Sequence, residues 1–166
     1  LCRKTCKLAQ KDLDARWTKK NGTSYFGYKN HVKVDSKSKI ITGYQVTSAS
    51  VHDSQPMDSL LDDKDALQDF YGDSAYTGEC PEKIIESKSM GNKACEKGYR
   101  NKPLTDVQKE NNREKSSVRS RVEHIFGFME ISMNGMYLYN IGIKRINSIV
   151  GLMNLTYNMF RKIQLK

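Results

Sequence analysis

Alternating apolar and polar residues mark the first regular segments of the chain. Over residues 25–35, apolar side chains stand at every second position except Asn30, which is the period of a half-buried strand. Residues 40–47 show a similar alternation, and the polar stretch 35–39 between them predicts a turn. Together the two segments predict a β-hairpin. Residues 1–23 are basic and weakly patterned, and we expect neither a strand nor a helix there.

Helical periodicity dominates the last fifty residues. Val118, Val122, Ile125 and Met129 recur at spacings of four, three and four, which places them on one face of a helix. A second apolar stripe over residues 146–160 predicts another helix. These two helices follow the strands in sequence, an order typical of an α/β fold in which helices flank a mixed sheet.

The middle of the chain predicts shorter elements. Asp53 is the expected capping residue of a helix that begins at Pro56. Pro81 predicts the start of a second short helix, and the apolar segment before Gly72 predicts a short strand. Residues 87–115 are polar, and we expect an irregular insertion there.

The composition of the chain favours a polyanionic partner and argues against a zinc site and a membrane-spanning helix. Lys and Arg outnumber Asp and Glu by 28 to 19, for a net charge of +9, which favours a polyanionic partner such as DNA or RNA over a neutral one. The four cysteines form no CxxC pair, so we expect reduced thiols and no zinc site. No run approaches the roughly 18 apolar residues of a membrane-spanning helix. We therefore expect a cytoplasmic protein without a membrane partner.

Two carboxylates occupy positions suited to catalysis. Asp73 follows a short apolar segment and is flanked by Gly72 and Gly78, and strand ends are places where functional groups gather. Taken alone, an Asp in such a turn more often serves the turn than catalysis. Glu123 follows Arg119 by one helical turn, which alone indicates only a surface ion pair. Brought together, two carboxylates can bind Mg²⁺, which prefers oxygen ligands.

The order of several short motifs resembles one family. The chain is similar to DDE transposases of the insertion-sequence-four and insertion-sequence-five group, from about Lys7 to Phe160. The motifs that carry the resemblance are residues 14–20 (DARWTKK), 25–31 (YFGYKNH), 49–54 (ASVHDS), 72–76 (GDSAY), 119–127 (RSRVEHIFG) and 151–159 (GLMNLTYNM). The resemblance implies an RNase H-like fold whose three acidic residues bind two divalent ions, Mg²⁺ or Mn²⁺.

Position within these motifs assigns roles to individual residues. The resemblance implies that Asp73 is the second catalytic and metal-binding carboxylate and Glu123 the third. Arg119 fills the Arg position that family members place before this Glu, and with Arg121 it is expected to contact DNA phosphates. Two positions depart from the family pattern, because Ser116 stands where Tyr is common and Glu130 where a basic residue is common.

The first catalytic carboxylate has no evident match. Asp14 lies in a segment that does not resemble a buried strand, so we expect the first Asp upstream of Leu1. By this interpretation residues 1–23 are a basic N-terminal segment, and residues 24–162 are a partial DDE catalytic domain that lacks its first strand. Asp14 or Asp35 as the third ligand is the alternative.

The resemblance implies cleavage and joining of DNA strands at transposon ends by a protein associated with the nucleoid, with a homodimer as the complete enzyme. Two alternatives remain open, a non-catalytic remnant that binds DNA and an RNase H-like nuclease. The histidines His31, His52 and His124 are interpreted as hydrogen-bonded or surface residues. Trp17 and Tyr25 stand among lysines and can stack on unpaired bases, although aromatic residues of strands more often belong to a core.

Overall fold

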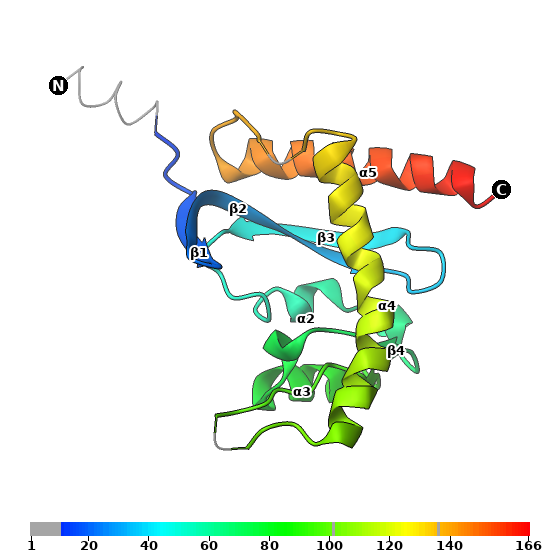
Figure 1. Cartoon of the computed structure of the whole chain (residues 1–166). Coiled ribbons are helices and arrows are strands. Elements are labelled where there is room, and N and C mark those ends of the chain that lie inside the picture. Colours follow the sequence, from blue (N-terminus) through cyan, green and yellow to red (C-terminus); the bar gives the residue numbers. More distant parts are fainter. Residues whose placement is uncertain (1–10, 101, 136) are drawn as a thin grey trace.

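The computed structural model describes residues 11–100, 102–135 and 137–166, in which two small sheets are joined and covered by helices (Figure 1). The first sheet is antiparallel, in the order β1 (Arg16–Lys20), β2 (Thr23–Val34) and β3 (Ile41–Ser48). The second sheet pairs β4 (Asp69–Phe70) with β5 (Gly91–Asn92) in parallel. The helices are α2 (Met57–Leu60), α3 (Glu79–Ser87), α4 (Asp106–Ile131) and α5 (Ile143–Gln164), with 3-10 turns η1 (Asp63–Asp65) and η2 (Ser74–Tyr76). The expected mixture of helices and strands is confirmed.

The strand β1 corrects the expectation that residues 1–23 hold no regular element. It forms a tight hairpin with β2 in which Lys20 pairs with Thr23, so Asn21 and Gly22 alone make the loop. Their φ angles of 50° and 83° are both positive, as a two-residue hairpin turn of type I′ requires. The Asn-Gly pair signals such a turn in the sequence, whereas the basic strand itself carries little apolar alternation. Residues 1–10 lie outside the described part of the chain.

The hairpin of β2 and β3 is confirmed, with β2 beginning at Thr23 rather than at residue 25. The loop between the two strands is closed by Asp35, whose carboxylate accepts hydrogen bonds from the Ser38 backbone N–H at 2.7 Å and from the Ser38 hydroxyl at 2.5 Å. This interaction fixes the end of β2 that faces α4.

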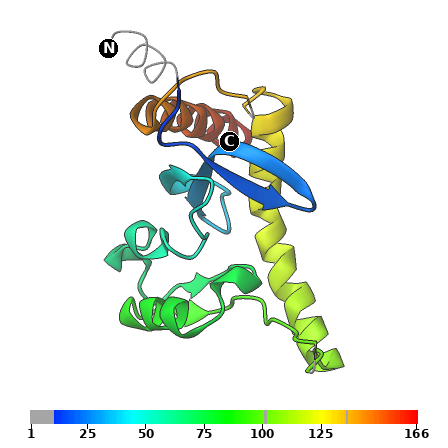
Figure 2. The same ribbon diagram turned by 90° about the vertical axis from the view of Figure 1, so that its left-hand side faces the viewer.

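The helix α5 covers one face of the antiparallel sheet (Figures 1 and 2). Ile146 and Val150 pack on Val46, and further along α5 the side chain of Asn158 bonds both the N–H and the carbonyl of Ile41 at 2.9 and 2.8 Å. A neighbouring cluster is formed by Ile41, Ile125, Met129 and Tyr157, which joins β3, α4 and α5. The predicted apolar stripes supply the buried residues Ile125 and Met129 of α4 and Ile146, Val150 and Tyr157 of α5, whereas Phe160 at the end of the second stripe is exposed.

A third cluster organises the lower half of the molecule. Met57, Leu61 and Ile85 are buried together, with Phe70 and Tyr76 packed against them. The strand before Gly72 and the helix containing Pro81 are thus confirmed, although α3 begins two residues earlier, at Glu79.

The predicted cap of the first short helix is wrong. Pro56 occupies the cap position of α2 and makes no side-chain capping bond, while the carboxylate of Asp53 accepts a hydrogen bond from Lys29 at 2.8 Å. The carboxylate is thus held by an ion pair with β2 and is not available to the helix end.

The irregular insertion predicted at residues 87–115 is also corrected. The segment contains β5, and its last ten residues form the start of α4. Thr105 and Gln108 form a reciprocal capping box at this helix end. The first turns of α4 are largely exposed to solvent, so they lack the apolar stripe from which a helix is predicted. Among the helices that the structure describes, none combines the length and apolar character needed to cross a membrane.

Candidate active site

Asp73 is positioned by the end of β4 and the start of η2. Its Oδ1 accepts a hydrogen bond from the Ala75 backbone N–H at 2.8 Å, as the capping residue of η2. Gly72 lets the chain approach closely here, because a Cβ at this position would lie 2.8 Å from the Phe70 ring and 2.9 Å from the Tyr76 ring. The second carboxylate oxygen of Asp73 remains directed toward α4.

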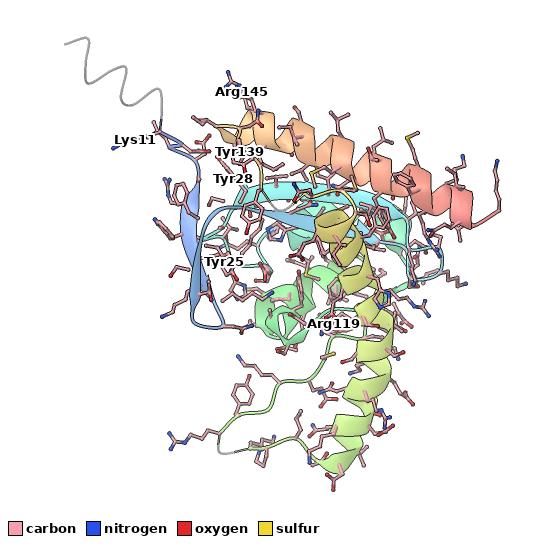
Figure 3. All side chains as sticks on the ribbon, turned by 45° about the horizontal axis from the view of Figure 1, so that its top comes forward. Lys11, Tyr25, Tyr28, Arg119, Tyr139 and Arg145 are labelled. Atoms are coloured by element: carbon pink, nitrogen blue, oxygen red, sulfur yellow. The ribbon has the colours of Figure 1, made fainter. Side chains whose placement is uncertain are left out.

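Arg119 joins Asp73 to Glu123. Its Nη1 lies 3.8 Å from Oδ2 of Asp73, and its Nη2 donates to Oε1 of Glu123 at 3.0 Å. Two carboxylates that stand fifty positions apart in sequence therefore approach the same guanidinium group, which projects from α4 (Figure 3). The structure brings together three of the four residues predicted for the site.

The fourth predicted residue, Arg121, lines the same cleft. The cleft encloses about 730 Å³ and is bounded by residues of β2, α2, β4 and α4, with Asp73, Arg119 and Glu123 on its wall. The guanidinium of Arg121 donates a hydrogen bond to the carbonyl of Ser36 in the loop after β2. This bond holds α4 against the β2–β3 hairpin at the mouth of the cleft.

The cleft separates the two sheets. Val32 and Val34 of β2 line one side, and Phe70 of β4 lines the other. In the described part of the chain β2 forms ladders only with β1 and β3, and β4 only with β5. The site is thus built at the junction of two sheets that do not pair with each other.

Asp14, the alternative third ligand, lies at the N-terminus of α5. Its Oδ2 accepts a hydrogen bond from the Ile143 backbone N–H at 3.0 Å, and Oδ2 of Asp12 accepts one from Gly142 at 3.1 Å. The two carboxylates thereby cap a helix whose own cap residue, Gly142, has no side chain. Asp14 is not among the cleft-lining residues.

Asp12 also anchors the sheet to this helix end. Its Oδ1 accepts a hydrogen bond from the hydroxyl of Tyr28 at 2.6 Å. Partial burial opposes ionisation of Asp12, but the hydrogen bonds from Tyr28 and from the backbone of Gly142, Ala15 and Asp14 lower its pKa. Burial, followed by the bond to Asp12, raises the pKa of Tyr28.

Asp35, the other alternative ligand, does line the cleft, although its carboxylate is bound by Ser38. Asp53 is a cleft residue that the sequence analysis interpreted only as a cap. Burial, and then the negative charges of Asp53 and Asp73, raise the pKa of Tyr76 to about 12. Tyr76 therefore remains a hydroxyl donor at neutral pH. The position of Asp53 in the ASVHDS motif did not distinguish this role from that of a helix cap.

The histidines agree with their interpretation as structural residues. His31 is buried and its Nε2 lies 2.8 Å from the hydroxyl of Thr47, while burial lowers its pKa. His52 and His124 are exposed. Within the described residues, no group of three or more His, Cys, Asp or Glu side chains gathers closely enough to bind a metal ion. Asp73 and Glu123 beside Arg119 are two carboxylates of the three that the family resemblance implies, and the position of the first stays a prediction.

These features define a protein with two carboxylates paired through an arginine in a cleft, and comparison with known proteins identifies its family. Residues 3–159 match the model of the transposase DDE domain, so the chain belongs to this family. It is 33% identical over 121 residues to the transposase for insertion sequence element IS1106 from Neisseria meningitidis serogroup B. That alignment covers 70% of this chain and 40% of the relative, so the chain spans less than half of the relative's length. No solved structure matches the chain.

Proposed function

We propose that this chain is part of the catalytic domain of an insertion-sequence transposase, which cuts and joins DNA strands at the ends of the element. The observation that supports the proposal most strongly is the contact of Asp73 and Glu123 with one guanidinium group, Arg119. Membership of the transposase DDE domain family supports the same chemistry. Asp73 serves as the second catalytic carboxylate and Glu123 as the third.

The two carboxylates fit the requirements of a divalent cation only in part. Mg²⁺ is commonly bound by one or two carboxylates together with substrate phosphates, and Asp73 and Glu123 supply that number. Mg²⁺ or Mn²⁺ held there in pairs would stabilise charge on the attacking and leaving oxygens of a phosphodiester. Arg119 offsets the repulsion between the carboxylates, and its partial exposure allows it to turn toward a DNA phosphate. Tyr76 lines the same cleft, and its raised pKa keeps its hydroxyl protonated at neutral pH.

The proposed fold is RNase H-like, completed by a strand that precedes the described region and carries the first catalytic Asp. The separation of β2 from β4 by the cleft supports this proposal, because one strand inserted there would join the two sheets. The apolar residues Val32, Val34 and Phe70 line the place that the strand would fill. Hydrogen exchange tests it: in the longer protein, amides of β2 and β4 should exchange more slowly than in this chain. Equal exchange rates would argue against a joining strand.

The test of function is a cleavage and strand-transfer assay with DNA carrying the element's ends, in a protein that contains this chain and its upstream region. Asp73→Asn and Glu123→Gln should each reduce the cleavage rate by at least about 100-fold, since misplacement of the reacting groups by about 1 Å has a cost of that order. Glu130→Gln is the matched control, because it removes the same charge from an exposed position of α4. Full activity of either catalytic variant would contradict the assignment.

The products of this assay also separate the alternatives. Cleavage without joining of strands would favour an RNase H-like nuclease. DNA binding without cleavage would favour a non-catalytic remnant.

We also propose that the complete enzyme is a homodimer located at the nucleoid. Support for self-association comes from the outer face of α5, where apolar side chains remain exposed at helical spacing: Leu152, Leu155, Met159 and Ile163. Sedimentation at increasing concentrations tests the proposal. A Leu155→Lys substitution should shift the equilibrium toward the monomer, and an unchanged equilibrium would exclude this face.

A further inference from the structure

The hairpin of β1 and β2 carries aromatic side chains on its surface rather than in the core. Trp17 and Phe26 are directly paired across the strands, with ring centroids 5.2 Å apart, and they are 66% and 52% exposed. Tyr25 occupies the opposite face and is 51% exposed. Figure 3 shows Tyr25 on this hairpin, which lies at one edge of the molecule. The expectation that aromatic residues of this segment pack in a core is therefore not met.

Basic residues accompany the aromatic rings on both faces of the hairpin. Alternation along β1 places Lys19 on the face of Trp17 and places Lys20 on the face of Tyr25. Both lysines are exposed, and no ion pair between described residues involves either of them. From residue 16 to residue 27 the sequence contains three Lys or Arg residues and no carboxylate. The surface thus combines apolar ring faces with uncompensated positive charge.

Charge decides which partner this surface fits. A second copy placed symmetrically against the hairpin would bring the same lysines together, because a two-fold interface pairs a surface with itself. A nucleic acid supplies negative phosphates for the lysines and flat bases for the rings. Bases stack on aromatic side chains in proteins that bind single strands, and the contact tolerates any base sequence.

We propose that residues 16–27, named here the aromatic ribbon, bind a DNA strand beside the cut, with Trp17 and Phe26 stacked on unpaired bases and Lys19 and Lys20 contacting phosphates. The inference rests on the proposed function for the placement of DNA in the cleft. Phe26 and the cleft-lining Val32 are six residues apart on β2, which corresponds to about 20 Å along a strand. That length equals about six nucleotide steps at the duplex rise of about 3.4 Å. The ribbon accordingly contacts DNA a short distance from the scissile phosphate.

The experiment uses Trp17 as its own reporter, because it is the single Trp of the chain. The 166-residue protein is titrated with single-stranded oligonucleotides of mixed sequence while tryptophan emission is recorded. Stacking predicts saturable quenching of Trp17 that is stronger with a single strand than with a duplex of the same sequence. Trp17→Ala, followed by fluorescence anisotropy of labelled DNA, should weaken binding by between about 5-fold and about 150-fold. Trp17→Phe should retain most of the affinity.

Matched variants show whether the ribbon is responsible. Lys19→Gln should weaken binding and reduce its salt dependence, whereas Lys83→Gln, which removes one charge from exposed α3, should leave both unchanged. Val107→Ala, at an exposed apolar residue in the first turn of α4, serves as the control for Trp17→Ala. Binding without a change of Trp17 emission, or equal losses from the variants and their controls, would overturn the proposal. Emission that changes with protein concentration alone would assign the surface to a second copy.

A separate measurement distinguishes failure of the proposed catalytic function from failure of the ribbon proposal. Asp73→Asn should abolish cleavage in the longer protein without altering the quenching of Trp17. Normal quenching in a protein that never cleaves DNA would therefore refute the catalytic assignment and leave the ribbon as a DNA-binding surface.

Discussion

Arg119 is the residue that links the two carboxylates of the candidate site, and it is also the residue proposed to contact a DNA phosphate. Its guanidinium contacts Asp73 and Glu123, while its Nε is buried without a hydrogen-bond partner among the described residues. Exposed ion pairs contribute at most about 1 kcal/mol to folding, and both carboxylates are partly exposed. Arg119 therefore contributes little to the free energy of folding, and we expect its larger effect to be on DNA binding.

At this scale we predict that Arg119→Gln weakens DNA binding evenly across sequences. Each lost phosphate contact should lower the slope of log affinity against log salt by about 0.9 on duplex DNA. Arg113→Gln, on the exposed face of the same helix, is the control. Titrations at several salt concentrations measure the slope, and an unchanged slope for Arg119→Gln would exclude a phosphate contact.

Asp12 gives a second prediction for a single residue. Its folded-state pKa is lowered, so the stability it contributes is fully present above the unfolded pKa of about 3.9 and is lost as pH falls through the folded value. Asp12→Asn removes the charge and turns an NH2 group toward a hydrogen-bond donor, because both carboxylate oxygens of Asp12 accept hydrogen bonds. It should lower the free energy of unfolding by about 1 kcal/mol near neutral pH. The free energy of unfolding of both proteins is measured by denaturant titration at pH 7 and at about pH 3. The difference from the parent protein should shrink at the lower pH.

Asp58→Asn is the control for this measurement, because Asp58 is exposed on α2. A loss of stability that is the same at both pH values would show that the Asp12 carboxylate has no special role.

At the scale of elements, the sequence of the β1–β2 hairpin predicts the turn but not the strand before it. The Asn21-Gly22 pair specifies the turn, but the strand before it lacks apolar alternation because its side chains face solvent on both sides. The first turns of α4 present the same difficulty, since a helix without a buried stripe has only its capping box to mark it. The apolar periodicity of the sequence therefore predicts elements with a buried face and does not predict elements that are exposed on all sides.

The hairpin turn can be tested by Gly22→Ala. A non-glycine residue in the left-handed region costs about 1–2 kcal/mol, and Gly22 has a φ of 83°. We expect faster hydrogen exchange at residues 16–27 with little change elsewhere, because β1 contacts mainly β2. Gly127→Ala, at a helical position with open space, is the control. Exchange that is unchanged in the ribbon would show that the turn does not set its stability.

At the scale of the whole molecule, the candidate site lies where the chain's two sheets face each other across a cleft. The residues Asp73 and Glu123 could be chosen from sequence through their motifs, but their meeting depends on contacts between β4, η2 and α4 that no local pattern encodes. The roles of Asp14 and Asp53 were equally inaccessible, because each is decided by a partner far away in the sequence.

We predict that this 166-residue chain cleaves DNA poorly by itself, with Mg²⁺ or Mn²⁺ present. Within its described residues no third carboxylate gathers with Asp73 and Glu123 closely enough to bind a metal ion, so a cation held there would lack both charge and a ligand. A nicking assay with the purified chain and its Asp73→Ala and Asp14→Ala variants measures this. Robust cleavage that is abolished by Asp14→Ala would place the third ligand in this chain.

The most direct test of the account is to locate a bound paramagnetic ion. Mn²⁺ added to ¹⁵N-labelled protein should first broaden the amide signals around Asp73 and Glu123, and Asp73→Asn should remove this effect. The three aspartates of residues 62–65 provide an internal comparison, because their carboxylates already form ion pairs with Lys33 and Lys88. Broadening centred on residues 62–65, or unaffected by Asp73→Asn, would contradict the assignment of the catalytic site.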